Sequence, residues 1–522
     1  EEVHKVQILD PATGTGTFLA EVVKQIHKKF EGQQGIWSNY VETHLLPRLN
    51  GFELLMASYA MAHLQLDLLL TETGYKPKTD QRFRVYLTNS LEESHPDTGT
   101  LFANWLSSEA NEANQIKRDT PVMCIIGNPP YSGESANKGE WIMKLMEDYK
   151  KGPGGKEKLN ERNPKWINDD YVKFLRYGQY FIEKNGTGII AFINPHGYLD
   201  NPTFRGMRWN LLKTYDKIYT IDLHGNSKKK ETAPDGSVDV NVFDIMQGVS
   251  INIFYKTGKK KTNELAKVFH FDLYGKRELK YDFLTENSFK TIEFKELPNI
   301  APNYYFVQKN FTSQKEFNEG FYIQDLFSVN NVGIVSANDK ILVNDSKESL
   351  LNLVSEFYKI EVDKEKVQKI LYRPFDTKYI YYDLTLVGRA REKIMQHFIH
   401  KNNVGLNWIR PMSSKYEFDI FISNTITDQC SAGNKSAGAG ISYLAPLYLY
   451  PESNNQQSID QVNSRTPNLN SEIVDKIATK INHLFLHDDN LLCDLPAGYA
   501  GHFSPIRLLD YIYAVLHSPT YR

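Results

Sequence analysis

The sequence predicts an α/β domain on a mainly parallel, Rossmann-like sheet with helices on both faces, followed by a mixed α+β domain. Three observations predict this. From the start to about residue 256, short β-rich apolar runs alternate with stretches of helical spacing, as in α/β units. A glycine-rich turn joins the first run to the first helical stretch. After residue 256 the alternation stops, so we predict the domains 1–256 and 257–522.

Seven strands and three helices are expected in the first domain. The strand candidates are Val6–Asp10, Leu49–Glu53, Phe83–Thr88, Val122–Gly127, Gly188–Asn194, Ile218–Leu223 and Val249–Tyr255. The helical candidates are Gly16–Phe30, Leu55–Thr71 and Val172–Asn185. In the second domain we expect strands at Tyr379–Asp383 and Ile441–Tyr450, helices at Leu350–Phe357 and Ile473–Leu486, and a flexible connection at Asn454–Asn470.

Composition excludes several classes of protein. The three cysteines are scattered and form no C-x-x-C pair, so we expect neither a disulfide framework nor a metal site. No run of about 18 apolar residues and no secretory signal is present, so we expect a cytoplasmic protein without membrane contact. The net charge is −2, so the chain as a whole would not attract nucleic acid, and any such contact would need local patches. Lys228–Lys230 and Lys259–Lys261 are candidates, although a short lysine run is more often a solvated loop.

The turn after the first strand is the expected cofactor site. Gly14 and Gly16 allow a tight turn and close approach to a ligand. Leu19 replaces the third glycine of a dinucleotide motif, and no lysine follows Gly16 as it would in a P-loop. Asp10 would repel a phosphate and attract an ammonium group. The alternative is a tight turn that binds nothing.

This turn resembles the cofactor motif of DNA amino-methyltransferases, Asp-Pro-x-x-Gly-x-Gly. The resemblance implies S-adenosylmethionine as the cofactor and a methyltransferase fold. The residues expected to bind it in this run are Asp10, Pro11, Thr13, Gly14, Gly16 and Phe18. Glu53, at the end of the second strand, can accept both ribose hydroxyls, unless it is simply a solvated glutamate. The resemblance gives Asn89, after the third strand, a place against the cofactor's adenine.

The segment Asn128-Pro129-Pro130-Tyr131 at the end of the fourth strand is the expected catalytic motif. Two prolines hold the backbone extended and remove two N–H donors. The Asn128 side-chain oxygen and the Pro129 carbonyl could each accept one hydrogen of an adenine N6 amine and aim its lone pair at a methyl donor. Tyr131 would stack on the base after it leaves the duplex.

The order of the motifs, with the cofactor turn first, resembles the γ class of adenine-N6 methyltransferases. That resemblance implies a second aromatic residue against the flipped base, and Phe243 is the candidate, with a core phenylalanine as the alternative. The second half resembles the specificity region of Type ISP restriction-modification enzymes, notably at residues 371–383 and 441–450. Double-stranded DNA is then the partner, and we expect nuclease and helicase domains in the full-length polypeptide, outside this chain.

Two rival functions remain open. One is a DNA specificity module whose methyltransferase fold is inactive. The other is a protein glutamine-N5 methyltransferase, because Asn-Pro-Pro-Tyr also occurs in those enzymes. The 266 residues after the first domain favour DNA, because the glutamine enzymes lack a large C-terminal module. Arg373, Lys378, Arg389, Arg391 and Arg410 could contact DNA, but the sequence assigns none of them a base.

Overall fold

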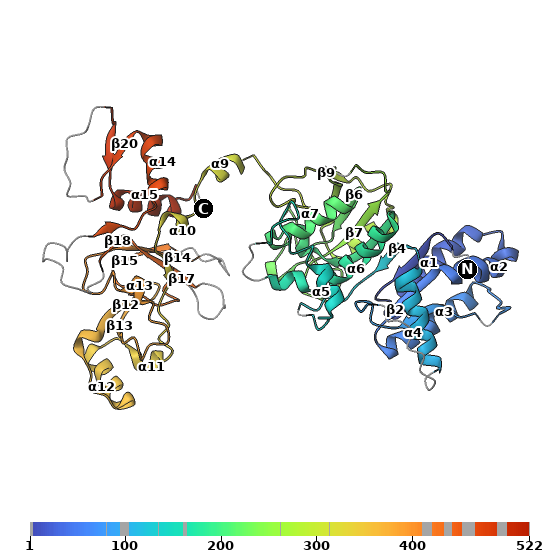
Figure 1. Ribbon diagram of the computed structural model, residues 1–522, viewed down its shortest axis with the longest axis horizontal. Coiled ribbons are helices and arrows are strands. Elements are labelled where there is room, and N and C mark those ends of the chain that lie inside the picture. Colours follow the sequence, from blue (N-terminus) through green and yellow to red (C-terminus); the bar gives the residue numbers. More distant parts are fainter. Residues whose placement is uncertain are drawn as a thin grey trace. The chain divides into compact units, whose positions relative to one another are not determined.

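The computed structural model describes residues 4–79, 81–93, 104–133, 135–159, 164–261, 263–312, 314–409, 420–432, 441–451, 465–487 and 498–520. The chain forms two compact units, Glu1–Asn310 and Phe311–Arg522. Figure 1 shows the first unit in blue to yellow-green and the second in yellow to red. The division lies beyond the expected boundary at 256/257, because residues 267–297 add two strands and a helix to the first unit.

A nine-stranded sheet of order β3-β2-β1-β4-β5-β7-β6-β8-β9 forms the centre of the first unit. β7 runs antiparallel to β5 and β6, and β9 runs antiparallel to β8, while the other neighbours are parallel. All seven expected strands are present, and β8 and β9 are additional. The strands are β1 (Gln7–Asp10), β2 (Leu49–Glu53), β3 (Arg84–Leu87), β4 (Val122–Gly127), β5 (Gly188–Pro195), β6 (Lys217–Asp222), β7 (Val249–Lys256), β8 (Lys267–Asp272) and β9 (Lys295–Leu297).

Helices cover both faces of this sheet. Successive side chains of a strand point to opposite faces. On β3, Val85 packs into the cluster that contains α1 and α3, whereas Tyr86 packs into the cluster that contains α4 and α6. The expected α/β class with a mainly parallel sheet is confirmed. The helices of this unit are α1 (Thr17–His27), α2 (Trp37–Tyr40), α3 (Met56–Glu72), α4 (Asn104–Asp119), α5 (Glu140–Met146), α6 (Asp170–Asn185), α7 (Arg205–Thr214) and α8 (Arg277–Glu286).

The second unit is a mixed α+β domain, as expected. Two four-stranded sheets, β10-β17-β14-β15 and β11-β13-β12-β16, are accompanied by two small strand pairs, β18-β19 and β20-β21. Its strands are β10 (Asn331–Val332), β11 (Val343–Asn344), β12 (Val367–Arg373), β13 (Asp376–Tyr381), β14 (Gly405–Ile409), β15 (Ile420–Ser423), β16 (Ile426–Thr427), β17 (Ser442–Pro446), β18 (Tyr448–Leu449), β19 (Thr466–Pro467), β20 (His483–Phe485) and β21 (Gly501–Phe503). Its helices are α9 (Gln314–Glu319), α10 (Ile323–Leu326), α11 (Asp339–Leu342), α12 (Lys347–Tyr358), α13 (Glu392–Met395), α14 (Ser471–Ile481) and α15 (Pro505–His517).

Most expected elements of the second unit are present. The helix expected at Ile473–Leu486 is shorter, because Asn482 takes a left-handed conformation with φ 56° and the chain continues as β20. Most of the expected connection Asn454–Asn470 lies outside the described residues. Among the described helices, none has both the length and the apolar character that a membrane span requires.

Candidate active site

The expected site residues meet at one edge of the large sheet. Asp10, Glu53 and Gly127 end β1, β2 and β4, and Asn89 follows β3. These strands are parallel, so their carboxyl ends lie at the same edge. β1 lies between β2 and β4, so the strand order reverses there. In open α/β sheets, ligands bind outside the carboxyl ends at such a reversal.

The turn between β1 and α1 is closely packed. Gly14 and Gly16 have φ values of 57° and 90°, in the left-handed region that favours glycine. A Cβ on Gly16 would lie 3.3 Å from the Cα atom of Ala62 in α3. The buried Thr13 donates from its backbone N–H to the Phe52 carbonyl at 3.0 Å, which ties the turn to β2. The geometry therefore requires glycine at position 16.

Two further residues of the expected cofactor motif flank this turn. Pro11 is buried, and its carbonyl accepts a hydrogen bond of 2.5 Å from the Ser90 hydroxyl. Phe18 lies half-buried in the first turn of α1.

Asp10 is fully buried and carries an unsatisfied oxygen. Its Oδ1 accepts a hydrogen bond of 3.1 Å from the Ala12 N–H, whereas Oδ2 has no hydrogen-bond partner among the described residues. Burial raises the pKa of Asp10 to about 7, against the lowering effect of the Ala12 hydrogen bond, and the Glu53 charge adds to the rise. A cation beside Oδ2 would satisfy this oxygen and favour the charged carboxylate.

Glu53 fastens the turn to its own strand end. Its Oε2 accepts a hydrogen bond from the Gly14 N–H at 2.8 Å, and Oε1 accepts from the N–H groups of Leu54 and Leu55 at 2.9 and 2.8 Å. A carboxylate offers about four lone-pair positions, so these bonds leave room for a hydroxyl group of a ligand. The carboxylate thus also has a structural function that the sequence did not reveal.

Asn89 faces the loop that follows the catalytic motif. Its side-chain N–H group donates to the side-chain oxygens of Glu92 and Asn137 at 3.1 and 3.2 Å. Its carbonyl accepts from the Lys117 ammonium group at 2.7 Å. Burial lowers the pKa of Lys117 to about 8. Asn89 therefore connects the end of β3 to the loop after β4.

The Asn-Pro-Pro-Tyr segment continues β4 without a helical turn. Asn128 is exposed, Pro129 is buried, and Tyr131 is half-buried. The single Tyr131 hydroxyl hydrogen is shared between two acceptors, the Asn128 side-chain oxygen and the Ile193 carbonyl, the latter at 3.1 Å. Burial raises the pKa of Tyr131, so the hydroxyl remains a donor. The hydrogen bond orients the Asn128 carboxamide and leaves its oxygen a second lone pair.

Tyr131 and Phe243 belong to the same part of the sheet edge. Both are partly buried side chains that pack on one hydrophobic cluster, formed by Ile221, Leu223, Val242, Val249 and Leu273. Phe243 lies in the segment before β7, and its N–H donates to the Asn241 side chain at 2.9 Å. Two aromatic residues expected to contact the same base are therefore close enough to share a cluster.

The start of α6 holds the loop after Tyr131, a feature that sequence reasoning missed. Asp169 accepts hydrogen bonds from the N–H groups of Ser132 and Gly133 at 3.1 and 3.0 Å. Asp170 accepts from the hydroxyl of Ser135 at 2.5 Å. A cavity of about 220 Å³ beside this loop is lined by residues that include Gly133, Ser135 and Lys173. The only sequence signal was an acidic pair at a helix start.

The expected basic patches have different environments. Lys228–Lys230 are exposed. Lys260, in the second run, donates from its ammonium group to the carbonyls of Leu212, Lys213 and Tyr215 at 2.9, 2.7 and 2.5 Å. Since these carbonyls lie at the end of α7, Lys260 caps that helix, and burial lowers its pKa to about 8.

Some basic candidates of the second unit are engaged in ion pairs. Arg373 pairs with Asp428 at 2.8 Å, and Lys378 pairs with Asp345 at 3.1 Å. Arg389 is exposed and Arg391 is half-buried, while Arg410 lies outside the described residues.

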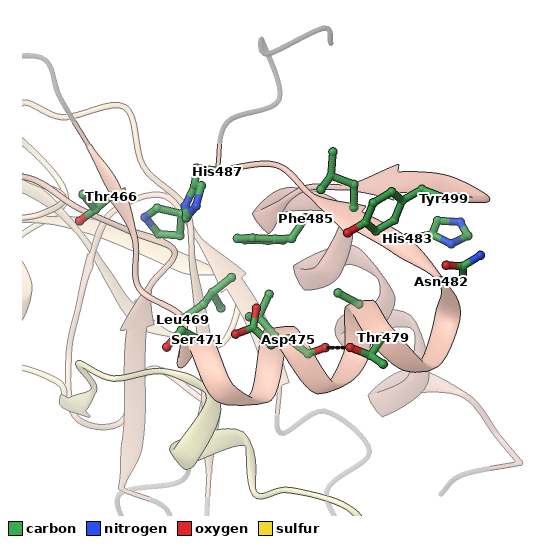
Figure 2. A pocket seen from close by; sticks show the side chains of 14 residues that line it. Thr466, Leu469, Ser471, Asp475, Thr479, Asn482, His483, Phe485, His487 and Tyr499 are labelled. Carbon is green, nitrogen blue, oxygen red and sulfur yellow. Dashed lines mark hydrogen bonds between the residues drawn. The ribbon is translucent and has the colours of Figure 1, made fainter. Parts of the chain in front are cut away.

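The second unit also contains a cavity of about 760 Å³ along α14 and β20 (Figure 2). Its lining includes Leu469, Val474, His483, Phe485 and Tyr499, and Figure 2 shows the Phe485 and Tyr499 rings above α14. None of the expected catalytic or cofactor residues lines this cavity.

Two family models match the chain in succession. Residues 1–192 match the DNA-methyltransferase domain of MmeI, and residues 357–522 match the Type ISP C-terminal specificity domain. No curated protein matches the chain. The expected resemblance to the methyltransferase and target-recognition parts of Type ISP enzymes is confirmed by these matches.

Three solved structures share the fold, each at 20% identity. A nuclease-deletion mutant of the Type ISP restriction-modification enzyme LlaGI, in complex with a DNA substrate mimic, matches with a TM-score of 0.62 over 92% of this chain and 41% of that chain. The ATP-dependent Type ISP enzyme LlaBIII bound to DNA matches with a TM-score of 0.68 over 99% of this chain and 35% of that chain. The DrdV–DNA complex matches with a TM-score of 0.66 over 99% of this chain and 51% of that chain. The chain thus spans between about a third and a half of these structures.

Proposed function

We propose that this chain transfers a methyl group from S-adenosylmethionine to the N6 amine of a flipped adenine in a specific duplex DNA sequence. The observation that supports this best is the contact between Asp10 and Gly127, since it puts the cofactor turn beside the Asn-Pro-Pro-Tyr segment. The match of residues 1–192 to a DNA-methyltransferase domain supports the reaction class. The Type ISP specificity match and the DNA in the similar structures support the substrate.

The residues of the turn fit the proposed cofactor. S-adenosylmethionine supplies a methyl group on a sulfonium centre and carries a cationic amine. The buried Asp10 has an oxygen without a partner, which suits a cationic ligand better than a phosphate. Glu53 would accept ribose hydroxyls beside its bond to Gly14, and the backbone at Gly14 and Gly16 allows close approach. Asn89 would contact the adenine moiety.

The strand end after β4 would activate the amine. The N6 lone pair is delocalised into the adenine ring, so the amine is a poor nucleophile. The Asn128 side-chain oxygen and the Pro129 carbonyl would each accept one amine hydrogen, which favours a tetrahedral nitrogen and aims the lone pair. The lone pair of the N6 nitrogen forms the new N–C bond, and the electron pair of the broken S–C bond stays on sulfur. One proton of the amine then leaves to water. We assign no general base.

Tyr131 and Phe243 would hold the adenine outside the duplex. Their common hydrophobic cluster places both rings beside β5, β6 and β7. Stacking on aromatic side chains offsets part of the cost of unpairing a base.

The second unit would select the DNA sequence. Because LlaBIII is described as ATP-dependent and LlaGI as a nuclease-deletion mutant, we also propose that nuclease and helicase parts act with this chain in a cytoplasmic restriction-modification enzyme.

A methyl-transfer assay on the full-length polypeptide tests this function. Tritiated S-adenosylmethionine and mixed-sequence duplex DNA should give label in the DNA, as N6-methyladenine after digestion. Asn128→Ala should lower the rate roughly 100- to 1,000-fold, as expected for the loss of one stabilising group, with unchanged cofactor affinity. Asn39→Ala, on the exposed side of α2, is the matched control and should leave the rate unchanged.

The same assay separates the two rival functions. Label in polypeptide instead of DNA would favour glutamine methylation. DNA binding without transfer, in a protein that binds the cofactor, would favour an inactive specificity module. Either result overturns the proposed reaction.

A further inference from the structure

A second polar cluster lies at the ends of β5, β6 and β8, outside the proposed methyl-transfer chemistry. It contains His196 after β5, Asp222 and His224 at the end of β6, Glu231 in the following loop, and Asp272 at the end of β8. In the part of the chain that the structure describes, no lysine or arginine forms an ion pair with its three carboxylates. The Asp222 side chain is buried, whereas those of Glu231 and Asp272 are 22% and 35% exposed. Three carboxylates grouped in this way favour a cation between them.

The His196 ring presents a nitrogen lone pair to this cluster. Its Nδ1 lies 2.9 Å from Asp222 Oδ1, and because a carboxylate only accepts, Nδ1 carries the hydrogen. In a neutral ring, Nε2 is then the acceptor, and the Asn226 side-chain N–H donates to it at 3.3 Å, so a metal on Nε2 would replace this hydrogen bond. The His196 side chain is only 7% exposed. A carboxylate on the outer nitrogen is the usual support of a metal-binding histidine.

His224 repeats this arrangement from the other side. Its Nε2 lies 2.8 Å from Asp272 Oδ1, so Nε2 carries the hydrogen. Its Nδ1 lies 3.3 Å from Glu231 Oε1. In a neutral His224 ring, Nδ1 and Glu231 Oε1 are both acceptors, so either a proton on Nδ1 or a metal ion must lie between them. The ring is fixed by stacking on Tyr274, with centroids 3.9 Å apart and planes at 12°.

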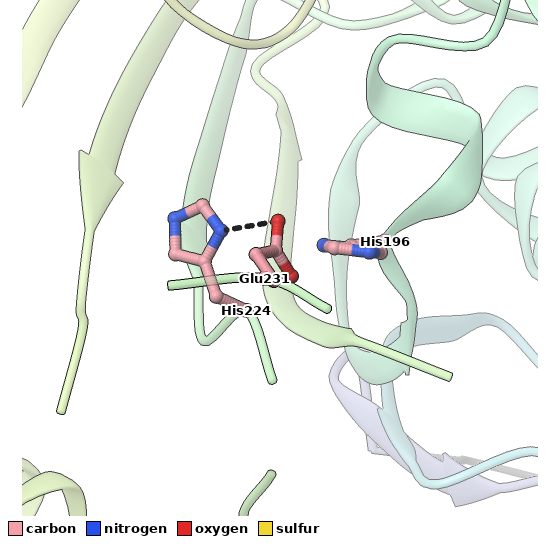
Figure 3. Close-up of side chains that lie close together, drawn as sticks. All are labelled: His196, His224 and Glu231. Atoms are coloured by element: carbon pink, nitrogen blue, oxygen red, sulfur yellow. Dashed lines mark hydrogen bonds and ion pairs between the residues drawn. The ribbon is translucent and has the colours of Figure 1, made fainter. Parts of the chain in front are cut away.

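We propose that His196, His224 and Glu231 bind a divalent transition-metal ion of the zinc class. Figure 3 shows the Glu231 carboxylate between the two imidazoles, with a His196 nitrogen turned toward it. One ligand atom from each residue lies within 4.8 Å of the others. Two ligands on tetrahedral zinc are roughly 3.3 Å apart, which equals the Nδ1–Oε1 distance. A charge-assisted hydrogen bond would be roughly 2.7 to 2.9 Å long.

The donor set selects the metal. Imidazole nitrogens favour zinc and its transition-metal neighbours, whereas magnesium and calcium prefer oxygen ligands. Three protein ligands leave a fourth position for water. The sequence did not predict this site because His196, His224 and Glu231 have no short-range ligand spacing and lie in different segments. No cysteine takes part.

The ion would fix the segment that carries Phe243. Glu231 also accepts from the Asn226 N–H at 2.9 Å, and Asn241 donates from its side chain to the Gly225 carbonyl at 3.2 Å. A Cβ on Gly248 would lie 2.5 Å from the His196 ring, so the segment ends against a ligand. Loop 225–248 is therefore tied to the metal ligands at both ends.

A proton on His224 would compete with the metal ion for this cluster. Burial alone would lower the pKa of His224, but hydrogen bonds to Asp272 and Glu231 outweigh it and raise the pKa to about 9. In the absence of a metal, a protonated His224 would therefore hold the cluster.

Metal analysis of the full-length protein tests this site directly. After treatment with a chelator, the protein is incubated with Zn²⁺, freed of excess metal and analysed by mass spectrometry. We expect about one ion per chain, a higher melting temperature with Zn²⁺, and visible Co²⁺ bands typical of a nitrogen–oxygen site. The Glu231 side chain is partly exposed, so the Glu231→Gln variant should fold. It should abolish all three signals. His483→Gln in the second unit is the matched control and should keep them.

Asp222→Asn distinguishes a supporting carboxylate from a ligand. It should weaken zinc affinity about 10- to 100-fold without changing the number of ions bound at saturation. A wild-type protein that retains no zinc, or a Glu231→Gln variant that retains it fully, overturns the proposal. Preferential binding of Ca²⁺ or Mg²⁺ would overturn the assignment of the metal class. None of these readouts depends on methyl transfer.

Discussion

Asp10 and Gly127 lie against each other at two neighbouring strand ends, and a Cβ on Gly127 would come within 2.7 Å of Asp10 Oδ1. The register of β1 and β4, with Leu9 opposite Ile125, sets this contact. The residue after Asp10 begins the cofactor turn, and the residue after Gly127 is Asn128. A side chain at position 127 would separate two segments that the proposed reaction needs side by side.

Gly127→Ala should therefore damage both stability and transfer. Crowding of this kind costs about 1–3 kcal/mol, measurable by urea unfolding, and we expect methyl transfer to be lost because Asp10 and Asn128 must move apart. Gly139→Ala is the control, since a Cβ there meets nothing within 4 Å. Equal stability and activity in the two variants would show that the contact is absent in solution.

Substitutions of Tyr131 should separate its hydroxyl from its ring. Tyr131→Phe loses the bonds to Asn128 and Ile193 but keeps the ring, so we expect a rate loss of about tenfold, near one hydrogen bond. Tyr131→Ala also loses stacking, which contributes about 1–3 kcal/mol per base. Cofactor affinity should stay unchanged in both. Single-turnover rates and fluorescence of a 2-aminopurine at the target base would measure the effects, and identical rates in the two variants would count against stacking.

Glu53→Gln should weaken cofactor binding. The amide keeps the size of the carboxylate but replaces one acceptor by a donor, which would face an N–H group of Gly14, Leu54 or Leu55. We expect the Kd for S-adenosylmethionine to rise by about tenfold or more, equal to about 1.4 kcal/mol. Calorimetric titration measures it, with Glu21→Gln, at an exposed ion pair on α1, as the control. An unchanged Kd would exclude Glu53 from ribose binding.

The sequence predicted the parts of the fold that rest on local pattern. The seven strands from β1 to β7 are short apolar runs with clear turn residues beside them. β8 (Lys267–Asp272) was not predicted, although α8 follows it, because the regular alternation of apolar runs and helical stretches ends near residue 256. Its pairing with β6 makes it part of the sheet. For the same reason, the first compact unit extends to Asn310, beyond the predicted boundary at 256/257. In α14, Asn482 ends a helix whose apolar spacing continues.

In the candidate site, too, the features that follow from local sequence pattern were predictable, and those that depend on contacts between distant segments were not. The common position of Asp10, Glu53, Asn89 and Asn128 could be predicted because each lies at or just after the end of a strand, and parallel strands end at one edge. The hydrogen bond from the Ser132 N–H to the Asp169 side chain could not be predicted, since it joins residues 37 positions apart. The cluster of His196, His224 and Asp272 depends on the pairing of β6 with the unpredicted β8.

The pH dependence of stability should reveal the burial of Asp10. Its pKa is about 7 in the folded protein and 3.8 as a model value. The folded state therefore holds one more proton than the unfolded state between these values, and stability falls as pH rises through this range. Asp10→Asn cannot titrate. We expect the free energy of unfolding of the wild type, relative to this variant, to decrease from about pH 4 to about pH 7 and then to level off. A constant difference would show that Asp10 is not buried as described.

Cofactor affinity should have the opposite dependence on pH. The charged form of Asp10 attracts a cation, and in the ligand-free protein this form becomes dominant only above about pH 7. The Kd for S-adenosylmethionine in the wild type should therefore fall as pH is raised through 7, whereas Asp10→Asn should bind weakly at every pH. Since ligand binding and folding respond to the same carboxyl group with opposite sign, titrations of both variants measure whether Asp10 carries charge for the cofactor. A pH-independent Kd in the wild type would assign Asp10 to the architecture of the turn alone.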